Sequence, residues 1–215
     1  MGIECTGYDL AVSNEGSFGP HPNIPFVQSD DEMMLFMDTL NDIEIVVRVL
    51  STETNFNACE IQSIDELKIF AEKAKFPSHA LIMKKSRYDF SDIRKGISTW
   101  EAMSEQFNEM RIRHGSVFVE TDMRAMCNPT RMSVIEKATQ RLADKIKLVC
   151  PICNTPGLGI TAVKEGLPCE LCGKPTHSII SHIYECQKCE YSNEVRYPNQ
   201  KETENPMYCN FVILK

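Results

Sequence analysis

Cys150-Pro-Ile-Cys153 and Cys169-Glu-Leu-Cys172 are two cysteine pairs with 15 residues between them. The two residues inside each pair let both sulfur atoms point into one tight turn, and two such turns complete a tetrahedral shell of four thiolates. Gly173 follows the second pair directly and suits a tight turn. Because this spacing is typical of a zinc ribbon, we expect these four cysteines to hold one structural Zn²⁺ in a closed shell, with no position left for water.

A third pair and a single cysteine follow, at Cys186-Gln-Lys-Cys189 and at Cys209. A second ribbon would use Cys209 as its third ligand, but Val212 occupies the position of the expected partner, so His177 or His182 is a candidate fourth ligand. Which pairs share a metal is not fixed by the sequence, and a nested grouping, first with last and second with third, also fits. The predicted metal ligands are Cys150, Cys153, Cys169, Cys172, Cys186, Cys189 and Cys209.

Disulfides and free buried thiols are the alternatives to metal. The chain opens without a basic start and an apolar core, so we expect no secretory signal and a cytoplasmic location. Cytosolic thiols stay reduced, which disfavours disulfides. A redox-active role suits one pair, whereas three clustered pairs suit metal better.

The cysteines also mark a boundary in composition near Leu148. Seven of the ten cysteines follow it, whereas Cys5, Cys59 and Cys127 are scattered singly. The chain has 215 residues, which is enough for one domain and a small module. We therefore predict a domain over residues 1–148 and a cysteine-rich module over residues 149–215.

Composition and charge limit the partners. The chain is 42% hydrophobic and 25% charged, which are globular values, and its net charge is −7. Duplex DNA is not an expected partner, because binding to phosphates is mostly cationic. The longest apolar runs, such as residues 33–37, are far too short to span a bilayer, so we expect no membrane association through a spanning helix.

The order of patterns in residues 1–148 predicts an α/β fold, a mixed sheet with flanking helices. We expect a hairpin turn at Leu40-Asn41-Asp42 and a glycine- and proline-rich loop from Glu15 to Pro22. A capping box at Ser63 and Glu66 starts one helix, and Asn128-Pro129 starts a long one. The strand candidates are residues 9–13, 33–38, 43–50, 80–83 and 116–119, and a further helix is expected over residues 98–112.

Helical spacing of apolar residues predicts which helix faces are buried. The faces of the first two helices are Leu67, Phe70, Ala71 and Ala74, then Trp100, Met103, Phe107 and Met110. The face of the long helix is Met132, Ile135, Ala138, Leu142 and Ile146.

Three polar segments accompany the predicted strands and suggest a site. They are Glu15-Gly-Ser-Phe-Gly-Pro-His21, Ser51-Thr-Glu-Thr-Asn55, and Glu120-Thr-Asp-Met-Arg124 with the nearby helix start at Asn128-Pro-Thr-Arg131. By the period of two along a strand, Glu120, Asp122 and Arg124 share one side, where two carboxylates can hold Mg²⁺ through waters. Arg124 and Arg131 can bind phosphates, helped by the helix amino terminus. The alternatives are ordinary surface loops and an ion pair that only fixes the helix.

The motifs resemble an uncharacterised bacterial family, a domain of unknown function. The resemblance covers nearly the whole chain and rests on Glu15–Pro22, Leu50–Phe56, Phe76-Pro-Ser-His79, Val119–Met132 and the cysteine pairs. In that family an additional segment precedes the region that matches Gly2, and the tail ends in a fourth C-x-x-C, so this chain departs from the pattern at both ends. A fainter, fold-level similarity is to inosine-triphosphate pyrophosphatases, in which such elements build a purine nucleotide site.

These observations give two hypotheses from different classes. The first is a zinc-binding enzyme that hydrolyses a nucleotide or another phosphoester with Mg²⁺, in which Glu15, Glu120 and Asp122 hold metal or water and Arg124 and Arg131 hold a small phosphorylated ligand. The second is a non-catalytic module that binds protein or single-stranded nucleic acid. Its candidate stacking residues are Tyr184, Tyr191, Tyr197 and Tyr208.

Overall fold

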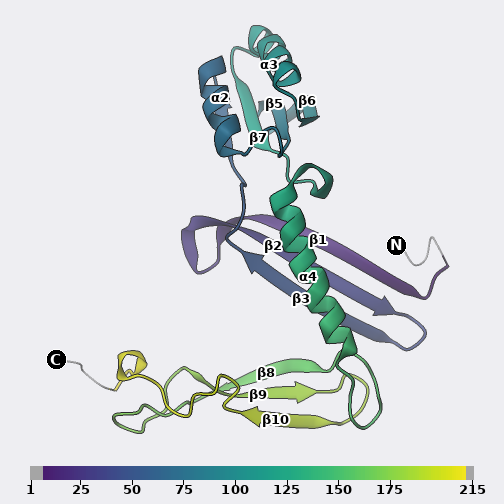
Figure 1. Cartoon of the computed structure of the whole chain (residues 1–215), viewed down its shortest axis with the longest axis vertical. Coiled ribbons are helices and arrows are strands. Elements are labelled where there is room, and N and C mark those ends of the chain that lie inside the picture. Colours follow the sequence, from purple (N-terminus) through teal and green to yellow (C-terminus); the bar gives the residue numbers. More distant parts are fainter. Residues whose placement is uncertain (1–6, 212–215) are drawn as a thin grey trace. The chain divides into compact units, whose positions relative to one another are not determined.

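The computed structural model describes residues 7–211, which form helices and three β-sheets (Figure 1). The prediction of an α/β chain with a cysteine-rich end is confirmed. In chain order the elements are β1 (Leu10–His21), β2 (Ile24–Asp38), β3 (Ile43–Ser51), β4 (Ala58–Ile61), α2 (Ile64–Lys73), β5 (Leu81–Ser86), β6 (Asp89–Ile97), α3 (Trp100–His114), β7 (Val117–Thr121), α4 (Pro129–Lys147), β8 (Gly159–Glu165), β9 (Ile179–Glu185) and β10 (Ser192–Arg196), with short 3₁₀ turns at Ala125–Cys127 and Pro206–Tyr208.

The described chain divides into two compact units. The larger unit comprises Val12–Leu35 and Val46–Gln140, and the smaller unit comprises Phe36–Ile45, the described residues up to Ala11 and the chain from Arg141 onward. Helix α4 ends at Lys147, one residue before the change in composition at Leu148. No helix of the described range combines the length and the apolar character that crossing a bilayer requires.

The main hydrophobic core of the larger unit lies between a four-stranded sheet and two helices. The sheet has the order β4-β7-β5-β6, each neighbouring pair is antiparallel, and α2 and α3 pack against it (Figure 1). Met103, Phe107 and Met110 of α3 are fully buried, as their spacing predicts, whereas Trp100 is 37% exposed. The face predicted for α2 is also buried, at Leu67, Phe70, Ala71 and Ala74.

The predicted helix starts are confirmed by their capping hydrogen bonds. Ser63 and Glu66 form a complete capping box at α2. At α4 the side-chain oxygen of Asn128 accepts a hydrogen bond from the Arg131 backbone N–H (3.0 Å). The buried face of α4 differs from the prediction: Val134, Ala138 and Leu142 are buried, but Met132 is 46% exposed. Ala138 and Leu142 of the predicted face are thus buried as expected, whereas at the start of the helix Arg131 contacts the buried Glu32.

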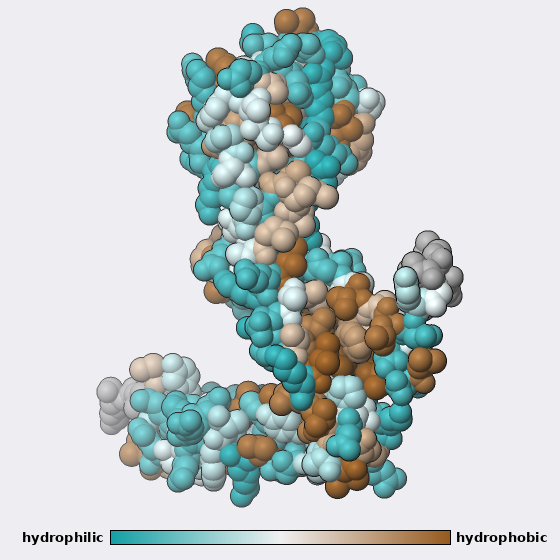
Figure 2. Space-filling model, turned by 45° about the vertical axis from the view of Figure 1, so that its right-hand side comes forward, coloured by the Kyte–Doolittle hydropathy of each residue, from teal (hydrophilic) through white to brown (hydrophobic). Residues whose placement is uncertain are grey.

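Strands β1, β2 and β3 form a second sheet in that order, and here one prediction is wrong. The glycine- and proline-rich segment expected to be a loop from Glu15 to Pro22 continues strand β1 as far as His21. The hairpin turn at residues 39–42 is as expected, with Asp42 at a positive φ of 54°. Figure 2 shows hydrophobic surface where this sheet lies, and Val12, Met33 and Val46 are 58%, 47% and 43% exposed.

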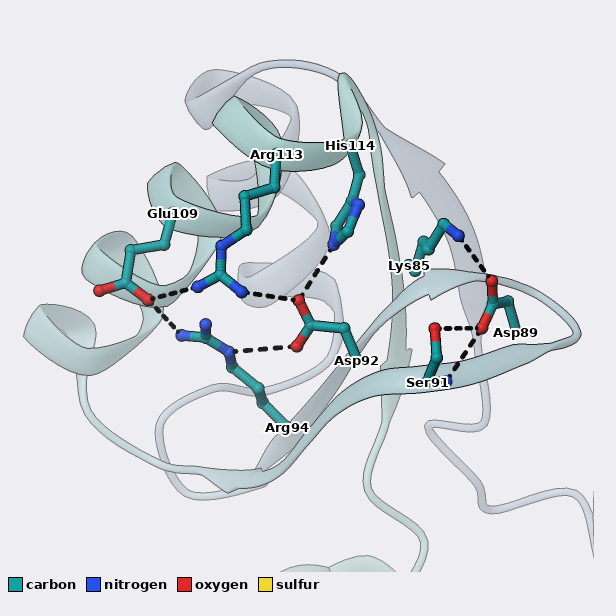
Figure 3. A network of polar contacts seen from close by, with 8 residues as sticks. All are labelled: Lys85, Asp89, Ser91, Asp92, Arg94, Glu109, Arg113 and His114. Atoms are coloured by element: carbon teal, nitrogen blue, oxygen red, sulfur yellow. Dashed lines mark hydrogen bonds and ion pairs between the residues drawn. The ribbon is translucent and has the colours of Figure 1, made fainter.

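A network of charged side chains links strand β6 to helix α3 (Figure 3). Asp92 of β6 contacts His114 Nε2 at 3.0 Å and Arg113 at 3.2 Å, and Arg94 binds Glu109 at 2.8 Å. The hydrogen bond from His114 is the largest cause that lowers the pKa of Asp92. His114 therefore has a structural role.

Candidate functional site

The cysteine pairs of the smaller unit sit in turns with the same backbone hydrogen bond. The N–H of Cys150 donates to Thr155, that of Cys169 to Lys174 and that of Cys186 to Tyr191, each to the carbonyl five residues on, at 2.9–3.0 Å. Two of the turns contain a second hydrogen bond. The Asn154 N–H donates to the Cys150 carbonyl, and the Gly173 N–H donates to the Cys169 carbonyl. Both donor residues have a positive φ. These backbone hydrogen bonds hold each pair in a turn.

These turns gather the seven cysteines of the module into two groups. Within each group the sulfur atoms all lie within 4.8 Å of one another. The first group has four members, Cys150, Cys153, Cys186 and Cys189, and the second has three, Cys169, Cys172 and Cys209. Both groups could hold a metal ion, so the expectation of metal-binding cysteines is supported.

The pairing predicted from spacing is wrong, because the first pair joins the third pair rather than the second. The nested alternative, first with last, is not what the structure shows either. The actual order is interleaved: the first pair with the third, and the second pair with Cys209.

The register of the third sheet explains this order. Strands β8 and β9 are antiparallel, and Gly159, just after the first pair, lies opposite Glu185, just before the third pair. At the other end of β8, Glu165 lies opposite Ile179, so the second pair follows the far end of the strand. Because β8 has seven residues, about 20 Å of strand separates the first two pairs.

The tail reaches the second pair through backbone pairing. Glu204 donates its N–H to the Pro168 carbonyl (2.8 Å) and accepts from the Glu170 N–H (3.0 Å). The turn Pro206–Tyr208 then leads to Cys209, whose sulfur lies 3.6 Å from that of Cys172. The second group therefore depends on a short parallel bridge between Cys169 and Glu204.

The sulfur spacing fits a metal shell and not disulfides. The Sγ atoms of Cys150 and Cys189 are 3.6 Å apart and those of Cys153 and Cys186 are 3.5 Å apart. A disulfide requires about 2.05 Å, whereas the edge of a tetrahedron with Zn–S bonds of ~2.3 Å is about 3.8 Å. The cysteines of the described residues are free thiols.

The two histidines predicted as ligands lie outside both groups. His177 pairs with Glu165 at 2.9 Å, and its side chain is 79% exposed. His182 lies in β9, opposite Val163 and Val195. Val212 lies outside the described residues.

The five residues predicted for catalysis have the following partners. Asp122 is buried and binds Arg124 at 2.6 Å, so these two do meet. Glu120 binds Lys84 at 2.8 Å. Arg131 binds Glu32 at 2.6 Å, whereas Glu15 lines a shallow depression. That depression is shared with Ser17, Asp31, Met33 and Arg48.

Asp122 is almost fully occupied by hydrogen bonds within the protein. Burial favours its protonated form, but hydrogen bonds from the side chain and N–H of Arg124, together with the N–H of Gly96, lower its pKa. This is the ion pair that the sequence offered as the alternative to a Mg²⁺ ligand. The catalytic assignment of Glu15, Glu120, Asp122, Arg124 and Arg131 stays a prediction.

Arg131 is the centre of a buried polar cluster in the larger unit. Its Nε donates to Glu32, its Nη1 donates to the Met123 carbonyl at 2.6 Å, and its guanidinium lies 5.0 Å from the ring of Phe18. A Cβ atom on Gly16 would come within 2.5 Å of both Arg131 and Glu32. Glycine at this position therefore lets strand β1 approach the ion pair.

Asp30 and Glu32, which sequence analysis missed, are the buried carboxylates of this cluster. Glu32 is satisfied by Arg131 and by Asn14 (2.8 Å), but neither oxygen of the fully buried Asp30 has a hydrogen-bond partner. Burial, and then the neighbouring Glu32, raise the pKa of Asp30 to about 7. The signal in the sequence was a run of acidic residues, Asp30-Asp31-Glu32, inside a strand whose alternate positions are buried.

His79 lies beside the start of α4 and contacts its first turn. Its Nε2 accepts the backbone N–H of Thr130 (3.2 Å), and its Nδ1 lies 2.9 Å from the Ser78 hydroxyl. Burial lowers the pKa of His79. The neutral ring thus caps the helix together with Asn128.

The binding hypothesis expected an exposed aromatic face on the module. Tyr208 is 63% exposed, whereas Tyr184, Tyr191 and Tyr197 are half-buried. One exposed tyrosine is not a stacking platform for successive bases.

Comparison with known proteins places the chain in a family. No match was found among the curated proteins or among the solved structures. The family profile that matches covers residues 1–213. The resemblance drawn from the motifs is thereby confirmed: the chain belongs to the family DUF6671, a domain of unknown function.

Proposed function

We propose that this chain is a zinc-binding protein in which two ions hold the cysteine module together. The observation that carries the proposal is the first group, in which Cys150, Cys153, Cys186 and Cys189 bring four thiols within 4.8 Å. An all-sulfur set favours soft or borderline ions, and Zn²⁺ in a tetrahedral shell is the usual occupant. A cytoplasmic location would keep the thiols reduced and available.

The role proposed for the ion in the first group is structural. Four thiolates leave no open coordination position, so this ion has no site for a reacting water. The strands beside it bury little: β10 is exposed along its length, and Ile160 and Val163 of β8 are 47% and 49% exposed. A sheet with so little buried apolar surface requires another source of stability, and a bound metal supplies it.

Metal content tests this proposal. Purified protein, measured by inductively coupled plasma and native mass spectrometry, is expected to carry two zinc ions per chain. The double variant Cys186→Ser/Cys189→Ser is expected to lose one ion, because it leaves two of four ligands. Cys59→Ser, which changes an exposed cysteine outside both groups, is the matched control and should retain both. Less than one zinc per chain in the wild type would contradict the proposal.

Hydrolysis of a nucleotide or another phosphoester with Mg²⁺ is the second candidate function. Arg124 supports it, because its side chain remains 47% exposed while Asp122 fixes its position, so a phosphate in solvent can reach it. The contacts of Asp122 disfavour it as a direct metal ligand. In this candidate function Glu15 and Glu120 would therefore bind the Mg²⁺. A screen of phosphorylated substrates with Mg²⁺ tests this candidate, with Asp122→Ala and Glu15→Ala as variants. No turnover, or equal turnover in the variants, would remove it.

A further inference from the structure

The second cysteine group offers a metal three ligands instead of four. Cys169, Cys172 and Cys209 lie together, and no histidine, aspartate or glutamate of the described residues joins them within the same 4.8 Å. The nearest acidic residue along the paired backbone, Glu204, has its carboxylate bound to Lys201 (2.9 Å) and to the Asn205 N–H (2.8 Å). The Glu204 carboxylate thus has other partners.

The sequence after Cys209 offers no second cysteine at the C-x-x-C spacing. The three cysteine pairs of the module have the spacing C-x-x-C. The residue at the same spacing after the single Cys209 is Val212, which cannot ligate a metal. The site otherwise retains the features of its counterpart: the Cys169 turn has the same backbone hydrogen bonds as the Cys150 turn.

Solvent can reach this group. Cys169 and Cys209 are buried, at 2% and 6% exposure, but Cys172 is exposed. A zinc ion with three protein ligands completes its tetrahedron with a molecule from solvent. Three thiolates and Zn²⁺ carry a net charge of −1, so a neutral fourth ligand adds no further charge to the site.

We propose that Cys169, Cys172 and Cys209 hold a zinc ion whose fourth position is occupied by a neutral ligand from solvent, water in the simplest case, and that this ion exchanges faster than the ion in the four-cysteine group. The proposal rests on the zinc binding proposed above and adds a functional difference between the two ions. The four-cysteine ion is a permanent structural element, whereas the three-cysteine ion is accessible to small donors such as imidazole or a thiol.

Transfer of zinc to a coloured chelator tests the difference. Wild-type protein loaded with two zinc ions is mixed with excess 4-(2-pyridylazo)resorcinol, and release is expected in two phases of equal size. In Val212→Cys, which restores the C-x-x-C spacing, the fast phase should slow by at least about tenfold, because a fourth thiolate replaces an exchangeable ligand. Cys209→Ser should remove the fast phase alone, and Cys59→Ser should change neither phase.

The results separate this inference from the zinc proposal. Release of both ions at one rate in the wild type, unchanged in Val212→Cys, overturns the open position but leaves zinc binding intact. Wild-type protein with a single zinc ion that survives Cys209→Ser overturns the three-cysteine site and the count of two ions, but leaves zinc in the four-cysteine group. Protein that contains no zinc overturns both proposals.

Discussion

Asp30 is fully buried without a hydrogen-bond partner for its carboxylate, and its contribution to stability should depend on pH. Its usual pKa of 3.8 is raised to about 7 in the folded chain. The folded protein therefore binds a proton that the unfolded chain has released, and the free energy of unfolding falls as pH rises from about 4 through about 7. The favourable contribution is complete at low pH and lost above pH 7.

Asp30→Asn should abolish this dependence. We expect the stability difference between pH 5 and pH 8, measured by urea unfolding of the zinc-loaded protein, to shrink by on the order of 1–3 kcal/mol relative to the wild type. Asp31→Asn is the matched control, since Asp31 is partly exposed and bound to Arg48, and it should retain the wild-type dependence. An unchanged pH profile in Asp30→Asn would show that Asp30 is not a buried acid.

Local signals in the sequence identified some residues of the larger unit correctly. The Asn128-Pro129 start of α4 and the proximity of Asp122 and Arg124 depend on neighbours along the chain, so pattern alone predicts them. The Arg131–Glu32 pair joins residues 99 positions apart, and no local pattern reports such a contact. For the same reason the contact between His79 and Thr130, 51 positions apart, was missed.

At the scale of elements, strand β1 is the clearest difference between expectation and structure. Glycine and proline favour loops locally, yet the segment from Glu15 to His21 continues a strand that pairs with β2, and Gly16 permits its close approach to the Arg131–Glu32 pair. Tertiary packing here overrides the local preference. In α2 and α3 the apolar periodicity is strong and tertiary packing agrees with the local preference, so both predicted helices are present.

Gly16→Ala should therefore destabilise the larger unit. Its Cβ would lie within 2.5 Å of the Arg131 Nη2 and Glu32 Oε1 atoms, and the buried Glu32 Oε1 already accepts a hydrogen bond from Arg131 Nε. We expect the free energy of unfolding to fall by about 1–3 kcal/mol in chemical denaturation. Gly19→Ala, on the same strand with nothing within 4 Å of its Cβ, should change stability by less than about 0.5 kcal/mol. Equal effects of the two substitutions would argue against the close packing of β1.

At the scale of the whole molecule, the grouping of the cysteines depends on strand pairing. The residue types and the three C-x-x-C pairs were enough to predict a metal module. They were not enough to predict which pairs meet, because each pair lies at the end of a strand that was not predicted from the sequence. The antiparallel register of β8 and β9 brings the first and third pairs to one end of the sheet. Spacing along the chain carries no information on that register.

Thiol protection in the double variant Cys186→Ser/Cys189→Ser tests this grouping most directly. The zinc-loaded variant is treated with N-ethylmaleimide, and the modified cysteines are identified by peptide mass spectrometry, with exposed Cys59 as the internal positive control. The interleaved grouping predicts that Cys150 and Cys153 become more reactive than in the wild type, while Cys169, Cys172 and Cys209 keep their wild-type reactivity. Continued protection of Cys150 and Cys153 together with Cys169 and Cys172 would contradict it.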